Sequence, residues 1–223
     1  MLPLYGISGI FSLPLNMQAG DFAEKYAEKK YGIGFDVSSS TYFRHDDNSG
    51  LFLVNLHPIV DKKVAYCQVG VLYRDPNNFS IEDTKVPDDC GKSITNGKFT
   101  NFLEENIINK YYNLKDVYMG AFLEDLPLSA YFQCRRDIGK GCESDKVIDV
   151  FNSNQNWNLT IEELLKKYSN NLAIKSVSIN IFNQKETPES IAKAMEFAFE
   201  LNKYLSRLTG TRKVKTLVIY IYS

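Results

Sequence analysis

A short loop between two cysteines holds three positively charged side chains. Arg135, Arg136 and Lys140 place three positive charges between Cys134 and Cys142, in a segment that also holds two glycines. Cations beside glycines, whose backbone amides can approach a ligand closely, are typical of sites for small anions. A solvated turn with acidic neighbours that offset the charge explains the same residues. We favour the turn and keep the three cations as a candidate anion site.

The same two cysteines form a candidate disulfide. Seven residues separate Cys134 from Cys142, and the glycines among them let the chain turn back without strain. Cys67 lies inside an apolar segment, where we expect a free thiol that behaves as a small hydrophobe. A bridge forms in oxidising compartments, so we expect a periplasmic or secreted protein, with the cytoplasm and reduced thiols as the alternative.

Two histidines suggest an enzymatic alternative. His45 and His57 flank one predicted hairpin, and either could act as a base beside the thiol of Cys90. Arg135 or Arg136 would then stabilise a negative charge, as in a small hydrolase or transferase. We expect the predicted turn to place His45 at an exposed tip, and no catalytic motif joins these residues. Catalysis is therefore the weaker hypothesis, and we assign no catalytic residue.

Two further motifs imitate binding loops. The segment 46–50 resembles the opening of a calcium loop, but His57 occupies the position that needs a bidentate glutamate. The segment 90–93 resembles the end of a phosphate-binding loop, but Val86 stands where that loop needs glycine. We expect neither site, and we predict no metal and no cofactor.

Composition excludes several classes of partner. The 223 residues carry 26 basic and 27 acidic side chains spread along the chain, for a formal charge of −1. This balance does not favour nucleic acid or an anionic membrane. No apolar run approaches the roughly 20 residues of a spanning helix. The apolar segment 1–15 resembles the middle of a signal peptide but lacks a preceding basic residue, so we expect either a native first strand or a numbering that begins after a removed signal.

The clearest elements lie in the last fifty residues. Residues 174–182 alternate between apolar and polar side chains, which predicts a strand with Val177, Ile179 and Ile181 on a covered face. A helix follows from Pro188 to about residue 209, and residues 214–222 predict another strand. An apolar stripe covers about half of this helix, so we expect the helix to lie on a sheet. The stripe consists of Ile191, Ala194, Met195, Phe197, Ala198, Leu201, Tyr204, Leu205 and Leu208.

The rest of the chain predicts a mixture of strands and helices. We expect strands at 35–43, 51–56, 64–73 and 128–134, and helices at 21–32, 99–114 and 160–168, the last with a capping box of Thr160 and Glu163. The polar segment 75–94 is predicted as a long loop, and loops of that length are often functional. Strands cluster early and mix with helices later, which favours an α+β class. We predict a single domain over residues 1–223, with about six strands in a mixed or largely antiparallel sheet and about four helices packed on it.

The residues favour a binding protein over an enzyme. Many Tyr and Asn side chains suit contact surfaces, and no coherent catalytic motif is present. We expect a non-catalytic binding or interaction protein, for an unknown protein or small-molecule partner. Such a protein should expose an apolar or aromatic patch, whereas an enzyme should have a concave pocket that holds a histidine beside a second titratable group.

Overall fold

The computed structural model describes most of the chain, in two compact units. The described residues are 12–44, 50–59, 66–75, 78–80, 88–125, 150–151, 155–169, 172–209 and 214–223. The first unit is Met1–Ile94 and the second is Thr95–Ser223. The predicted α+β class is confirmed, and the described strands form two sheets, one in each unit, where we expected one. The single domain stays a prediction.

A helix and an antiparallel sheet make up the first unit. Its elements are α1 (Ser12–Tyr31), β1 (Phe35–Arg44), β2 (Gly50–Pro58), β3 (Cys67–Asp75) and β4 (Asn78–Ser80), with the strands in the order β1-β2-β3-β4. The three predicted strands of this region are confirmed. Strand β4, which pairs with the end of β3, lies within the segment 75–94 that we predicted as a loop.

Small side chains let α1 lie close to the sheet. Ala19, Ala23 and Ala27 recur every four residues and are fully buried, so one narrow stripe of the helix faces β1, β2 and β3. The helix starts earlier than predicted but ends where expected. Gly32 adopts φ +69°, and its N–H donates to the carbonyl of Glu28 at 2.9 Å. A glycine in this left-handed conformation is the common way to end a helix.

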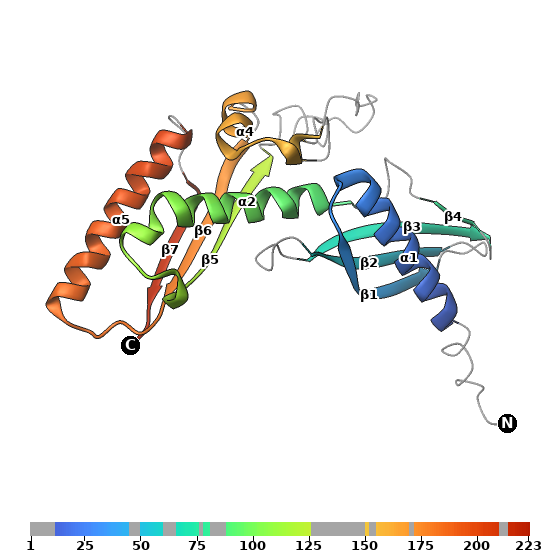
Figure 1. The fold of residues 1–223 in the computed structure, drawn as a ribbon, viewed down its shortest axis with the longest axis horizontal. Helices are drawn as coiled ribbons and strands as arrows, with labels where there is room; N and C mark the ends of the chain where they lie inside the picture. Colours follow the sequence, from blue (N-terminus) through green and yellow to red (C-terminus); the bar gives the residue numbers. More distant parts are fainter. Residues whose placement is uncertain are drawn as a thin grey trace, which may run out of the picture. The chain divides into compact units, whose positions relative to one another are not determined.

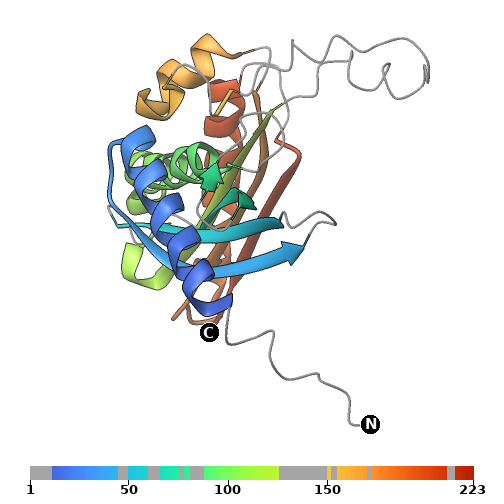
Figure 2. The ribbon, with the colours of Figure 1, turned by 90° about the vertical axis from the view of Figure 1, so that its right-hand side faces the viewer.

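The second unit places helices against a three-stranded mixed sheet. Its main elements are α2 (Cys90–Asn106), which crosses the unit boundary, β5 (Val117–Asp125), α4 (Ile161–Lys167), β6 (Leu172–Ile181), α5 (Pro188–Thr209) and β7 (Thr216–Ile221). Strands β5 and β6 are antiparallel, β6 and β7 are parallel, and the order is β5-β6-β7. Two parallel neighbours need a crossover, which α5 supplies (Figure 2). The predicted strand 128–134 lies outside the described residues.

The core of the second unit lies on one face of this sheet. Val177, Ile179 and Ile181 of β6 are fully buried, as predicted, and they pack in one cluster with residues of α2, α4 and α5. Thr160 and Glu163 form the predicted capping box at the start of α4. Each of these local features follows from a short sequence pattern, because a period of two or a reciprocal cap involves only neighbouring residues.

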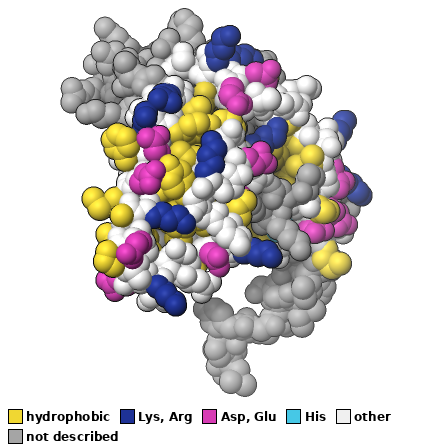
Figure 3. All heavy atoms as spheres, turned by 60° about the vertical axis from the view of Figure 1, so that its left-hand side comes forward, with side chains coloured by type: hydrophobic (Ala, Val, Ile, Leu, Met, Phe, Trp, Pro, Cys, Tyr) yellow, Lys and Arg dark blue, Asp and Glu magenta, His cyan; other side chains and the backbone are white. Residues whose placement is uncertain are grey.

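The apolar stripe of α5 is buried over only part of its predicted width. Phe197, Leu201 and Leu205 are fully buried, so the helix does lie on the sheet. Ile191 and Met195, which we assigned to the same stripe, are exposed, Met195 by 70%. With 3.6 residues per turn, Met195 lies about 120° around the helix from Leu201 and faces away from the sheet. On the α5 side of the molecule, hydrophobic side chains lie among charged ones (Figure 3).

Candidate binding surface

The predicted site residues fall mostly outside the described part of the chain. This applies to His45, Cys134, Arg135, Arg136, Lys140 and Cys142, and to most of the calcium-like loop at 46–50. The candidate anion site and the Cys134–Cys142 bridge therefore stay predictions. The structure does describe His57, Cys67 and Cys90, the other residues considered for chemistry.

Cys67 and Cys90 are bonded to each other. The disulfide joins the start of β3 to the first residue of α2, and both cysteines are almost fully buried. The expectation that Cys67 is a free thiol is therefore wrong. The bond also removes the free thiol that the enzymatic alternative requires of Cys90. Local sequence could not identify this pair, because four cysteines allow three connectivities and spacing alone does not select one.

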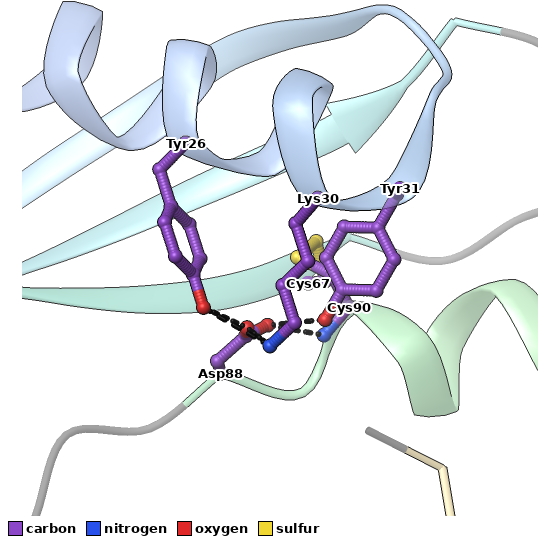
Figure 4. A network of polar contacts seen from close by, with 6 residues as sticks. All are labelled: Tyr26, Lys30, Tyr31, Cys67, Asp88 and Cys90. Atoms are coloured by element: carbon purple, nitrogen blue, oxygen red, sulfur yellow. Dashed lines mark hydrogen bonds and ion pairs between the residues drawn. A yellow bond between two sulfur atoms is a disulfide. The ribbon is translucent and has the colours of Figure 1, made fainter. Parts of the chain in front are cut away.

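A buried carboxylate lies beside the disulfide (Figure 4). The carboxylate of Asp88, in a side chain only 10% exposed, is 2.6 Å from Nζ of Lys30. It also accepts hydrogen bonds from the hydroxyls of Tyr26, at 2.9 Å, and Tyr31, at 2.8 Å. The N–H of Cys90 donates to the same carboxylate at 3.2 Å. Four donors from α1 and α2 thus converge on one negative charge.

This network ties the segment before α2 to the rest of the first unit. Asp88 forms a β-bridge with Val69 of β3. The next residue, Asp89, accepts from the N–H of Gln68 at 2.6 Å and donates its own N–H to the carbonyl of Gln68 at 3.2 Å. The predicted loop therefore ends in residues that are bonded to β3 and have a structural role. A buried carboxylate is tolerated here because it is paired and fully hydrogen-bonded.

The proton affinities of this network also favour a structural role. Burial raises the pKa of the Tyr26 phenol, so the hydroxyl remains a hydrogen-bond donor and is a poor base at neutral pH. Burial lowers the pKa of Lys30, but its hydrogen bonds to Asp88 and Tyr26 outweigh that effect and the net pKa is raised. A lysine that stays charged is neither a nucleophile nor a base.

A possible metal cluster in the same place is blocked by the disulfide. Ligand atoms of Cys67, Asp89 and Cys90 lie within 4.8 Å of one another. Thiolates, not bonded sulfur atoms, ligate metals. With the two sulfur atoms joined, the carboxylate of Asp89 is the one ordinary ligand that this group offers.

We expect the stability of the protein to fall above about pH 10 because of Tyr31. Burial, and next the charge of Asp88, raise the pKa of Tyr31 in the folded state. An unfolded tyrosine ionises near pH 10. Above that pH the unfolded chain releases a proton that the folded one keeps, so stability is complete below about pH 10 and falls as the pH rises toward the folded pKa.

Urea unfolding at pH 7, 9, 10 and 11 measures this loss. Tyr31→Phe should be less stable at pH 7, because Asp88 loses a donor, but should lose less additional stability above pH 10. Tyr66→Phe is the matched control, since Tyr66 is 61% exposed. An alkaline slope equal in wild type and Tyr31→Phe would contradict the role of Tyr31.

His57, the histidine that the structure describes, lies on the sheet of the first unit. His57 is half-buried on the face of β2 that points away from α1, and its ring centroid is 5.0 Å from that of Tyr66. Its Nδ1 is buried and makes no hydrogen bond in the part of the chain that the structure describes. A catalytic base needs a partner that orients its ring. Among the described residues, His57 has an aromatic neighbour and no such partner.

The second sheet leaves a surface of aromatic and small polar side chains. On the side of β5, β6 and β7 that points away from the helices, strand register places three residues in each of three rows. We call this surface the outer face. Its rows are Tyr118–Asn180–Tyr220, Gly120–Ser178–Val218 and Phe122–Ser176–Thr216.

Large aromatic side chains of the outer face are exposed. Tyr118 is 72% exposed, Tyr220 is 50% exposed and Phe122 is 41% exposed. At one end of the face, the rings of Phe182 and Tyr222 stack with centroids 5.0 Å apart. Their side chains lie at the ends of β6 and β7, next to the row of Tyr118 and Tyr220. This group of exposed aromatic side chains makes the outer face a candidate contact surface.

The sequence pattern predicts only part of the outer face. The polar side of β6, with Ser176, Ser178 and Asn180, follows from the alternation that predicts the strand. Strand β5 was missed, because Gly120 interrupts its pattern. Without β5, Tyr118 and Phe122 could not be assigned to any surface.

Comparisons with known proteins do not identify this chain. No protein-family model, no curated protein and no solved structure matches it. No described helix is both long and apolar enough to cross a membrane. The assignment of a function therefore depends on the surfaces described above.

Proposed function

We propose that this protein is a non-catalytic binding protein and that the outer face of its second sheet is the binding surface. The exposure of Tyr118, Phe122 and Tyr220 on one sheet face carries this proposal. Removal of apolar surface from water is favourable by about 25 cal/mol for each Å². A ligand that covers these exposed rings therefore gains free energy on binding.

The residues that the structure describes give little support to the hypothesis that the protein is a hydrolase or transferase. Its thiol, Cys90, is bonded to Cys67, and His57 lies beside Tyr66 with Nδ1 unpaired in the described chain. The raised pKa values of Tyr26, Lys30 and Tyr31 keep these side chains protonated at neutral pH. These observations favour binding without chemical conversion.

We further propose that the protein is exported. The buried Cys67–Cys90 disulfide is consistent with an oxidising compartment, since thiols in the cytoplasm are normally kept reduced. The predicted Cys134–Cys142 bridge would add to this inference.

Thermal unfolding with a chemically diverse ligand library tests the binding surface. The library should contain neutral and acidic oligosaccharides, proline-rich peptides, nucleotides and aromatic metabolites. We expect at least one class to raise the Tm of the wild type by a few degrees, because a ligand that binds the folded state stabilises it. The Tyr118→Ala/Tyr220→Ala variant should fold but lose this shift.

Mass spectrometry of the recovered ligand distinguishes binding from catalysis. The ligand should return unchanged after prolonged incubation with the protein. Conversion to a product would contradict the non-catalytic proposal. A shift in Tm that survives removal of both tyrosines would exclude the outer face as the binding surface.

A further inference from the structure

The outer face is uncharged over all three of its rows. None of its nine residues is acidic or basic. Three charged residues lie beside the row of Phe122, at one end of the face. Glu124 and Lys215 form an ion pair with each other, and Lys175 is exposed at a bulge of β6, next to Ser176. Phosphate polymers and anionic lipids need several unpaired cations, and basic peptides need unpaired carboxylates. Away from this end, the rows of Tyr118 and Gly120 therefore suit an uncharged ligand.

The size of the face favours a small or extended ligand over a folded protein. Two strand spacings separate Tyr118 from Tyr220, which is about 10 Å, and four residues along β5 separate Tyr118 from Phe122, which is about 13 Å. A stable interface between folded proteins buries about 800 Å² on each partner. With the Phe182–Tyr222 pair one row farther on, the face spans about 10 by 20 Å, which is still small for such an interface.

The aromatic rings and the central strand offer two different kinds of contact. A Cβ at position 120 would lie 3.1 Å from Cε2 of Phe122, so the Phe122 ring lies against the backbone of Gly120. Between the rings, β6 presents the hydroxyls of Ser176 and Ser178 and the amide of Asn180. Each of these groups can both donate and accept hydrogen bonds. The hydroxyl of Tyr222 donates to Oδ1 of Asn180 at 3.2 Å, which holds that amide in place.

This combination matches the chemistry of a sugar ring. A pyranose has C–H groups on its faces and hydroxyls at its edge, and every hydroxyl both donates and accepts. Polarised C–H groups pack favourably against the negative face of an aromatic ring. We propose that the outer face binds an uncharged oligosaccharide, with sugar rings against Tyr118, Phe122 and Tyr220 and hydroxyls bonded to the central strand. This inference rests on the proposed function of the outer face.

Titration of the full chain with defined hexasaccharides tests the proposal. The neutral probes are cellohexaose, maltohexaose, mannohexaose and chitohexaose, and binding is followed by NMR chemical shifts and calorimetry. At least one neutral probe should bind the wild type. Tyr118→Ala/Tyr220→Ala should weaken that binding at least about tenfold, because two rings lose their contacts. Tyr66→Ala, which removes an exposed tyrosine of the first unit, should leave the affinity unchanged.

A second variant tests the position of a ring without removing it. Gly120→Ala places a methyl group 3.1 Å from Cε2 of Phe122, so the ring must move by a few tenths of an ångström. We expect a several-fold weaker affinity for the neutral probe with little change in far-ultraviolet circular dichroism. Binding that is unchanged in both Gly120→Ala and Tyr118→Ala/Tyr220→Ala would overturn the proposed contacts.

Charged and peptide probes separate this inference from the proposed function. A hexamer of galacturonic acid should bind more weakly than the neutral probe, and decaproline should not bind. If no neutral hexasaccharide binds but decaproline does, and its binding needs Tyr118 and Tyr220, the carbohydrate assignment fails while the outer face remains the binding surface. If binding of every probe is insensitive to these tyrosines, both proposals fail.

Discussion

Val177→Asp should unfold the second unit of the protein. Val177 is fully buried in β6, between Ala121 of β5 and Leu217 of β7. An aspartate there would place a charge in the core without a partner, because the neighbouring side chains are apolar. We expect a loss of at least about 4 kcal/mol, which is a large part of the stability of an ordinary domain.

Two variants on the same strand serve as controls for Val177→Asp. Ser178 is the next residue and points to the outer face, so Ser178→Asp should cost less than about 1 kcal/mol. Val177→Ala should remain folded and lose about 1 to 3 kcal/mol, since it removes methyl groups but adds no charge. Urea unfolding monitored by circular dichroism measures all three variants. A soluble, cooperatively folded Val177→Asp protein would show that the inner face of β6 is assigned wrongly.

Loss of the Cys67–Cys90 disulfide should destabilise the first unit by about 3 kcal/mol. The bond closes a loop with a sequence separation of 23 residues. In the chain-entropy model, a loop of this size restricts the unfolded chain by about 3 kcal/mol. Both cysteines belong to Met1–Ile94, so the effect of Cys67→Ala/Cys90→Ala should concentrate there. Faster hydrogen exchange in α1 and β3, with little change in β6, is the expected result.

The other two cysteines provide the control for this experiment. Cys134→Ala/Cys142→Ala should alter exchange only near the loop that holds Arg135, Arg136 and Lys140, because the loop they are predicted to close is short. Mass spectrometry of a non-reduced digest identifies both bridges directly. Free thiols at Cys67 and Cys90 in protein from its native compartment would contradict the disulfide and weaken the case for export.

Local sequence patterns were sufficient for most of the individual elements. The alternation along β6, the capping box of Thr160 and Glu163 and the glycine that ends α1 each depend on residues within a few positions of one another. Their physical causes are side-chain periodicity and the unpaired amides and carbonyls at helix ends. For the same reason, the α+β class could be predicted before any tertiary information, although β4 and β5 were not predicted.

The sequence by itself therefore determined the class of fold and the inner face of β6, and tertiary structure decided which distant residues meet. Tyr26 and Asp88 are 62 residues apart, yet they form one hydrogen bond. The Cys67–Cys90 bond and the rows that join Tyr118 to Tyr220 across β6 depend likewise on strand order and register. Periodicity carries no information on strand order, because the same alternation suits any neighbour in a sheet. The outer face, and with it the proposed function, exists only once β5, β6 and β7 lie side by side.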